Sequence, residues 1–410
     1  MFPAPLPFPV PRAHMPVSWT LLLVLALAGA GYFVTRARVV ALAGGDVRRL
    51  HSRPSYHGWN AALLTALPAL FLIAIWRFVQ PAANATPVAI LALVLAAAGL
   101  GFALVRSAPG FRARNAVESM VKGLLILCSS IAILTTAGIV FSMLFESGHF
   151  FRQYPWHDFF FGTTWSPRFG GGSQLGILPL LWGTLYISLI ALAVSVPIGL
   201  FAAIYMSEYA SPRLRGVAKP MIEVLAGIPT IVYGLFALIT VGPMLRDYFA
   251  QPLGLGNSGS SVMTAGLVMG IMLIPFVSSL SDDIINAVPQ SLRDGALGLG
   301  STQSETVRKV VLPAALPGIV GAVLLAASRA IGETMIVVLG AGAAARMDLN
   351  PFEAMTTITV KIVSQLTGDN DFAAPETLVA FALGLTLFVI TLGLNIVALY
   401  VVRKYREQYE

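Results

Sequence analysis

Long apolar runs, separated by short polar segments, dominate the pattern along this chain of 410 residues. Many of these runs contain about 20 residues, which is the length an α-helix needs to cross the hydrocarbon core of a bilayer. The short alternating strands of an outer-membrane barrel would give a different pattern. The pattern therefore predicts an all-α polytopic membrane protein with about nine spans, near 17–35, 60–79, 87–105, 120–145, 177–207, 223–245, 262–281, 316–342 and 377–402.

Composition agrees with this class of protein. The chain is 57% hydrophobic and 11% charged, whereas soluble domains are roughly 25% charged. The formal net charge is +7, but arginine and lysine in the short loops of a membrane protein orient its helices. The charge therefore gives no indication of a nucleic-acid partner. The single cysteine, Cys128, excludes an internal disulfide and a cysteine-based metal site.

Every second loop between the predicted spans is basic. Because basic loops stay in the cytoplasm, we expect the amino terminus to lie outside and the carboxy terminus to lie in the cytoplasm. The basic residues of these loops and of the carboxy-terminal end are Arg36, Arg38, Arg48, Arg49, Arg53, Arg106, Arg112, Arg114, Lys122, Arg213, Arg215, Lys219, Arg293, Arg308, Lys309, Arg403, Lys404 and Arg406.

A break in the apolar pattern near residue 110 divides the chain. We expect an accessory transmembrane region over 1–110, a first core helix with an outside loop over 111–178, and a transport domain over 179–405 that contains a cytoplasmic loop at 282–315. The outside loop at 147–176 is rich in aromatic residues. It is either an interfacial aromatic belt or a short structured lid that contacts a partner outside.

The cytoplasmic loop contains a polar, glycine-spaced segment, DGALGLGSTQSETVRKVVLP, at residues 294–313. Ser291 with Asp294, and Thr302 with Glu305, have the spacing of a capping box. Each pair is therefore expected to begin a short helix, with a glycine-rich turn between the two helices. Two short helices with small exposed residues would suit docking into a groove of a partner.

This segment resembles the EAA loop of ABC-importer permeases, in which an acidic residue and two alanines precede a glycine and a terminal aliphatic-x-Leu-Pro. Here Asp294 and Gly295 replace the usual glutamate and first alanine. The resemblance implies that the loop contacts a separate ATPase subunit. The residues that it assigns to this coupling are Asp294, Gly295, Ala296, Gly300, Glu305, Arg308, Lys309, Val310, Leu312 and Pro313.

The predicted span 316–342 contains two charged residues, Arg329 and Glu333. A charge at the bilayer centre costs roughly 2.5–3.5 kcal/mol on the insertion scale, and the four-residue spacing places both side chains on one helix face, where they can neutralise each other. They form either a structural ion pair or part of a substrate path. Because a guanidinium matches the geometry of an oxyanion, we expect Arg329, Glu333, Ser328 and Thr334 to line a substrate pathway.

The predicted span 223–245 contains candidates for a gate. Pro229 would remove a helix hydrogen bond and produce a kink. Glu223, Gly227 and Gly234 lie close to it in the sequence. The alternative is that the glycines serve close helix packing.

From about residue 115 onwards the chain resembles the PstC-type membrane subunit of bacterial phosphate ABC importers. The resemblance rests on the loop above and on the strings FFFGTTWSPRFGGGSQLGILPLLWGTLYIS, GIPTIVYG and RAIGET. It implies a type I importer permease fold with six core helices, preceded here by about three accessory helices. It also implies location in the inner membrane and three kinds of partner: a PstA-type second permease, cytoplasmic PstB-type ATPase subunits and an extracytoplasmic PstS-type phosphate-binding protein.

No G-x-x-x-x-G-K-[ST] loop occurs in the chain, so ATP hydrolysis is expected on a partner, and this subunit is expected to be non-catalytic, with no metal or cofactor. A permease for another oxyanion, molybdate or sulfate, is the nearest alternative. From another class, an integral-membrane enzyme could use Arg329 and Glu333, although only five histidines occur and no clustered metal set accompanies them. A passive channel would leave the loop at 282–315 unexplained.

Overall fold

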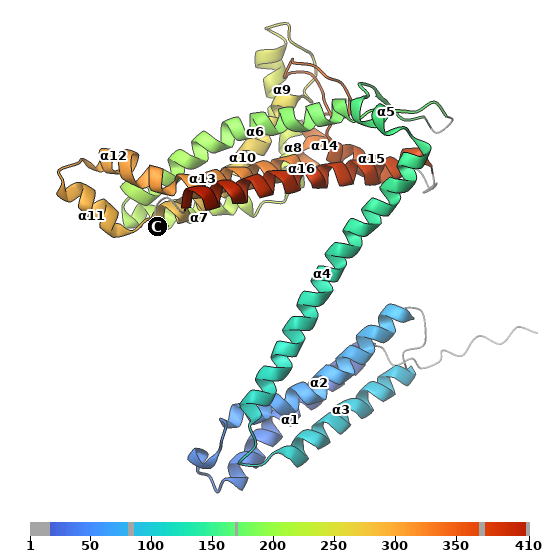
Figure 1. Cartoon of the computed structure of the whole chain (residues 1–410), viewed down its shortest axis with the longest axis vertical. Helices are drawn as coiled ribbons and strands as arrows, with labels where there is room; N and C mark the ends of the chain where they lie inside the picture. The colour runs from blue at the N-terminus through green and yellow to red at the C-terminus, as the bar shows by residue number, and fades with distance from the viewer. Residues whose placement is uncertain (1–16, 81–85, 169–170, 369–373, 407–410) are drawn as a thin grey trace, which may run out of the picture. The chain divides into compact units, whose positions relative to one another are not determined.

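The computed structural model describes residues 17–80, 86–168, 171–368 and 374–406, and most of them are helical (Figure 1). Within these ranges, nine helices or continuous helical runs are long and apolar enough to cross a membrane, which confirms the predicted number of spans. The nine are Val17–Leu42, Pro54–Val79, Thr86–Arg106, Ala113–Gln153, Leu178–Tyr209, Thr230–Ala250, Val262–Ala287, Gln303–Ile331 and Pro375–Lys404.

The chain divides into two compact units within α4 (Ala113–Gln153), the first ending at Thr136 and the second beginning at Ala137. In the first unit, α1 (Val17–Leu42), α2 (Pro54–Val79) and α3 (Thr86–Arg106) lie side by side (Figure 1). The division of the sequence at residue 110 stays a prediction. A small apolar core joins the three helices: Val24, Ala69, Ile73, Ala92 and Ala96.

In the second unit, α6 (Leu178–Ile204) packs along α10 (Val262–Ala287), and α13 (Leu312–Ile331) packs against α16 (Pro375–Arg406). The shorter elements of this unit connect or extend the long helices. They are α5 (Trp156–Phe161), β1 (Trp165–Ser166), β2 (Gln174–Leu175), the π-helical η2 (Tyr205–Tyr209), α7 (Pro212–Ala226), α8 (Thr230–Phe236), η3 (Ala237–Val241), α9 (Gly242–Leu245), η4 (Arg246–Ala250), α11 (Gln290–Gly298), α12 (Gln303–Thr306), η5 (Val307–Val311), α14 (Met335–Gly340) and α15 (Ile358–Gly368).

The aromatic loop that follows α4 is a structured element. After α5, the short strands β1 and β2 pair antiparallel, with Trp165 opposite Leu175. Phe150 and Phe159 are fully buried, and their rings meet edge to face with centroids 5.4 Å apart. The loop therefore packs into an apolar core that it shares with α6, α15 and α16; contact with an outside partner stays a prediction.

The sixth span begins later than predicted. The segment 223–245 is not one helix, because α7 ends at Ala226 and α8 begins at Thr230. Pro229 occupies the N-cap position of α8 with φ −56° and ψ 136°. The expected proline kink is therefore wrong: a proline has no N–H to donate, and here it precedes a helix instead of interrupting one.

Glycines allow α6 and α10 to approach closely. Gly266 and Gly270 lie four residues apart on α10, a spacing that brings membrane helices together. A Cβ atom added to Gly270 would lie 2.8 Å from the Cβ of Val194 and 3.1 Å from the carbonyl oxygen of Ala191. Both of these residues belong to α6, so this contact limits the size of residue 270.

We predict that Gly270→Leu forces α6 away from α10 and lowers stability by about 1–3 kcal/mol, the usual effect of overpacking. The measurement is the thermal unfolding midpoint of the purified chain in detergent. Gly393→Leu is the matched control, because no atom lies within 4 Å of a Cβ added at Gly393. Equal midpoints for the two variants would contradict the prediction.

Candidate functional site

The segment that resembles an EAA loop forms two short helices, α11 and α12. Gly300 lies between them with φ +88°, a left-handed conformation that favours glycine. The predicted capping box at the start of α12 is confirmed: the N–H of Glu305 donates to Thr302 Oγ1 at 3.3 Å, and the N–H of Thr302 donates to Glu305 Oε2 at 3.1 Å. The sequence therefore specified the turn and the second helix.

The other predicted capping box does not form. α11 begins two residues earlier than expected, with Pro289 instead of Ser291 at its N-cap and no side-chain cap. Asp294 instead accepts a hydrogen bond from Gln290 Nε2 at 3.0 Å within the helix. Because the proline already fixes the first turn of the helix, Ser291 lies inside the helix and cannot act as its cap.

The loop exposes apolar side chains to its surroundings. Leu299 is 92% exposed, and Leu292 and Leu297 are 45% and 47% exposed. Gly295 and Gly298 have open space where a side chain would be. The other predicted coupling residues lie as follows: Ala296 in α11, Lys309 Nζ 3.4 Å from Glu305 Oε1, Arg308 exposed, Val310 within η5, and Leu312 and Pro313 in the first turn of α13.

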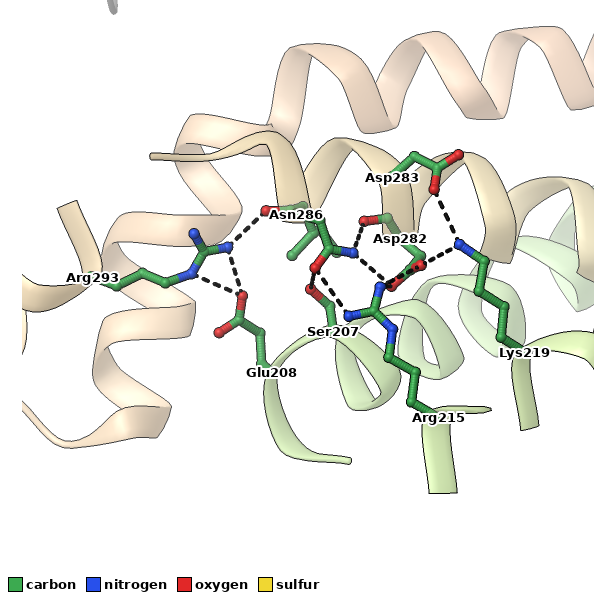
Figure 2. A network of polar contacts seen from close by, with 9 residues as sticks. Ser207, Glu208, Arg215, Lys219, Asp282, Asp283, Asn286 and Arg293 are labelled. Carbon is green, nitrogen blue, oxygen red and sulfur yellow. Dashed lines mark hydrogen bonds and ion pairs between the residues drawn. The ribbon is translucent and has the colours of Figure 1, made fainter. Parts of the chain in front are cut away.

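Behind this loop, a buried carboxylate joins α10 to α7 (Figure 2). The side chain of Asp282 is 0% exposed. Arg215 Nη2 donates to its two oxygens at 3.1 and 3.0 Å, and Lys219 Nζ donates to Oδ2 at 2.9 Å. Asn286 Nδ2 donates to Oδ1 at 2.9 Å. A buried charge without such partners would be strongly destabilising, so these contacts hold the two helices together.

The same cluster extends to the surface through Lys219. Its Nζ also lies 3.2 Å from Oδ1 of Asp283, whose side chain is 65% exposed. The hydrogen bond to Asp282 raises the pKa of Lys219. The ammonium group therefore keeps its charge throughout the neutral range and neutralises the buried acid.

A second ion pair ties α11 to the ends of α6 and α10 (Figure 2). Arg293 Nη2 lies 2.9 Å from Glu208 Oε1, and both side chains are almost buried, at 12% and 11% exposure. The guanidinium also donates to the carbonyl oxygens of Ile285 and Val288 at the end of α10. Gln303 Nε2, at the start of α12, donates to the carbonyl oxygen of Glu208. Both short helices are thus attached to the transmembrane part.

The sequence pattern did not identify these two polar clusters as a site. Arg215, Lys219 and Arg293 served only to orient the predicted spans. Two signals were present: the adjacent acids Asp282 and Asp283 end an apolar run, and Arg215 and Lys219 have the four-residue spacing that puts both on one helix face. Neither signal indicates that the acids and the bases meet.

The predicted span 316–342 is interrupted. α13 ends at Ile331 and α14 begins at Met335, with Gly332 at the C-cap of α13. Glu333 lies in this break and is 9% exposed. Its Oε1 accepts from the N–H groups of Thr334 and Met335 at 3.1 and 3.0 Å, and from Ile336 at 3.5 Å. The carboxylate satisfies backbone groups that the start of a helix leaves without partners.

The alternative of a structural Arg329–Glu333 ion pair is not realised, because the helix ends between the two residues. Arg329 lies in the last turn of α13, and its guanidinium carbon is 4.2 Å from the ring centroid of Phe276. Within the described ranges, no acidic side chain pairs with Arg329. Arg329 is exposed in the isolated chain, so its donors are available to a ligand or to another subunit. Ser328 precedes it, and Thr334 follows Glu333.

The gate candidates separate into two groups. Glu223 lies in the last turn of α7, and Gly227 ends that helix. Gly234 lies in α8 against α14, where an added Cβ atom would be 2.9 Å from the carbonyl oxygen of Met335. The hydroxyl of Tyr233 donates to the carbonyl oxygen of Leu225 at 2.8 Å, which ties α8 back to α7 across Pro229. The structure thus places Gly234 beside the helix break.

Residues 195–407 match a family profile described as binding-protein-dependent transport system inner membrane component, and residues 21–92 match one described as phosphate ATP-binding cassette transporter. The chain is 37% identical to Phosphate transport system permease protein PstC 1 of Mycobacterium tuberculosis over 278 residues, which cover 60% of this chain and 81% of that protein. It is 32% identical to Phosphate transport system permease protein PstC of Haemophilus influenzae over 307 residues, which cover 71% of this chain and 95% of that protein. A similar chain occurs in the solved structure of a bacterial alginate ABC transporter in complex with an alginate pentasaccharide-bound periplasmic protein. The two chains are 15% identical, the match covers 70% of this chain and 97% of that chain, and the TM-score is 0.48.

We predict that Glu333→Ala loosens the start of α14, while Glu333→Gln preserves it. Glutamine keeps an oxygen that can accept from the same N–H groups, whereas alanine leaves them without a partner, a loss of about 0.5–2 kcal/mol. Hydrogen exchange of the amides at 334–336 measures the difference. Equal exchange rates in the two variants would show that the carboxylate does not cap this helix.

Proposed function

The chain belongs to the family of binding-protein-dependent transport system inner membrane components, and we propose that it is the permease subunit through which an ATP-driven importer moves inorganic phosphate across the inner membrane. It is a multi-pass, non-catalytic transport subunit. Its relatives are phosphate transport permeases, which favours phosphate over molybdate or sulfate. ATP hydrolysis and extracytoplasmic capture of the substrate take place on partner chains, of the PstB and PstS type, and a PstA-type permease completes the membrane part.

The observation that carries this proposal is the position of Arg329. A guanidinium within the apolar part of the membrane is costly to expose to lipid, and no acid neutralises Arg329 within the described part of the chain. Its exposed side chain therefore faces a polar path that the second permease closes. Five donors in a fork fit a phosphate oxyanion, and the ring of Phe276 holds the guanidinium in place without occupying those donors.

Glu333, Ser328 and Thr334 have supporting roles in this path. Glu333 holds the start of α14 through the backbone, which keeps the break beside Arg329 open. Ser328 and Thr334 flank the break and carry hydroxyl groups that can donate to an anion. Gly234 of α8 packs against Met335, so a movement of α8 would change the width of the path. Glu223, Gly227 and Pro229 lie where α8 joins α7.

The coupling loop at 282–315 lies on the cytoplasmic side, with the amino terminus outside and the carboxy terminus in the cytoplasm. The basic residues that follow every second span support this orientation. The exposed side chains of Leu292, Leu297 and Leu299 enter a groove of the ATPase. Asp294, Gly295, Ala296, Gly300, Glu305, Arg308, Lys309, Val310, Leu312 and Pro313 form the rest of this coupling surface.

The two polar clusters carry movement of this loop to the path. Arg293 joins α11 to Glu208 and to the end of α10. Asp282 of α10 binds Arg215 and Lys219 of α7. α7 then leads through Tyr233 to α8, which packs against α14. The acids and bases of these clusters are positioning residues, because they touch neither substrate nor nucleotide.

We predict that Arg329→Gln abolishes phosphate uptake while assembly is kept, because glutamine carries no charge for the anion. The experiment uses proteoliposomes that contain this chain with its second permease and ATPase, supplied with phosphate-loaded binding protein. Arg246→Gln is the control: Arg246 is partly exposed and pairs with its neighbour Asp247. Normal uptake by Arg329→Gln would contradict the role of Arg329. Transport of molybdate or sulfate in preference to phosphate by the unmodified complex would contradict the proposed substrate.

We predict that Asp282→Asn lowers the amount of phosphate imported per ATP hydrolysed by about tenfold, within the range of coupling free energies carried by side-chain networks. Asn removes the charge that holds Arg215 and Lys219. Asp283→Asn is a matched control, since this neighbour is 65% exposed and its ion pair among the described residues is with Lys219. A purely structural role would lower transport and ATP hydrolysis together and leave their ratio unchanged. If Asp282→Asn assembles poorly, Lys219→Gln tests the same coupling with one cation removed, and Lys219→Arg should restore the ratio.

A further inference from the structure

The positive charge of the protein is concentrated in the first unit. Residues 1–136 contain eleven arginines and lysines against two acids, a net charge of +9, whereas residues 137–410 contain fifteen against seventeen, a net charge of −2. Charges needed only to orient the spans would be spread along the chain. The excess therefore points to a specific use of this accessory unit.

The antiparallel arrangement of the helices gathers these charges at one end of the unit. The carboxyl ends of α1 and α3 meet the amino ends of α2 and α4 there, and a hydrogen bond from the N–H of His51 to the carbonyl oxygen of Pro109 links the two loops. The two acids of the unit are already engaged, Asp46 by Arg49 and Glu118 by Arg114. The basic end consists of nine exposed residues: Arg36, Arg38, Arg48, Arg49, Arg53, Arg106, Arg112, Arg114 and Lys122.

A groove with an apolar floor opens beside one of these arginines. It has a volume of about 610 Å³ and lies along one face of α1. Phe33, which is 67% exposed, begins the groove, and the turn at Gly45 with φ +80° closes it. The guanidinium of Arg36 has no hydrogen-bond or ion-pair partner in the described residues. The remaining lining residues are small or aliphatic: Ala37, Val40 and Ala41.

We propose that this groove binds an anionic phospholipid, with the phosphate on Arg36 and an acyl chain along Ala37, Val40 and Ala41. The combination of a cation without a partner in the described residues and an open apolar groove matches a molecule that has both a phosphate and a hydrocarbon tail. The surrounding basic end increases the local concentration of anionic headgroups, because each basic residue near such a membrane attracts them. A free phosphate ion would use the cation but would leave the apolar floor uncovered.

The experiment is lipid binding to the full chain in detergent micelles, counted as bound lipids per folded molecule by native mass spectrometry. We expect phosphatidylglycerol to bind and phosphatidylcholine, at the same concentration, to bind much less. Arg36→Gln should weaken binding of phosphatidylglycerol by about tenfold, the loss expected when a hydrogen bond between charged groups is removed. Ala37→Trp should also weaken it, because the indole fills the groove and leaves the charge unchanged.

Arg38→Gln is the matched control. Arg38 is exposed on the same helix two residues further on, and it does not line the groove. An equal loss of binding in Arg36→Gln and Arg38→Gln would show that diffuse charge, not this groove, attracts the lipid. Unchanged binding in Ala37→Trp would overturn the proposal in the same way. Displacement of phosphatidylglycerol by an equal concentration of inorganic phosphate would show a site for the free anion instead.

Discussion

In a chain that is 57% hydrophobic and 11% charged, each charge within the apolar part must be neutralised, hydrogen-bonded or exposed to a polar path. The buried carboxylate of Asp282 shows this constraint most clearly, since two cations and an amide surround it. Its desolvation would otherwise cost several kcal/mol. The requirement for these partners fixes α7 against α10, and it thereby fixes the place from which the coupling loop extends.

The same constraint explains why Glu333 is buried while Arg329 is exposed. Gly332 ends α13, and the backbone N–H groups at the start of α14 then require an acceptor within the protein. Glu333 supplies it and is buried, whereas Arg329, as far as the described residues show, lies against the face of an aromatic ring without an acidic partner and remains exposed. The charge of Glu333 is thus stabilised by backbone N–H groups, and in the described residues no acid neutralises Arg329. The break between α13 and α14 can therefore attract an anion, which suits the proposed transport of phosphate.

The two units distribute charge in opposite ways. The second unit pairs several of its acids and bases and has a net charge of −2, whereas the first unit has eleven basic residues against two acids, a net charge of +9. Paired charges hold neighbouring elements to one another, as Arg293 of α11 and Glu208 of η2 do. Unpaired charges at a membrane surface attract anionic headgroups. The proposed coupling and the proposed lipid site therefore depend on the same side-chain chemistry in different surroundings.

The sequence by itself determined the class of the protein, its number of spans, the capping box at Thr302 and Glu305, and the family. Apolar length, local hydrogen-bond spacing and short motifs carry this information, and none of them depends on distant contacts. Only the tertiary structure decided that Pro229 precedes a helix, that Ser291 lies inside one, and that Arg329 and Glu333 are separated by a helix end. It also decided that Asp282 meets Arg215 and Lys219 across more than sixty residues of sequence. These outcomes depend on which helices pack together, because burial creates the need for a partner and packing alone brings that partner within reach.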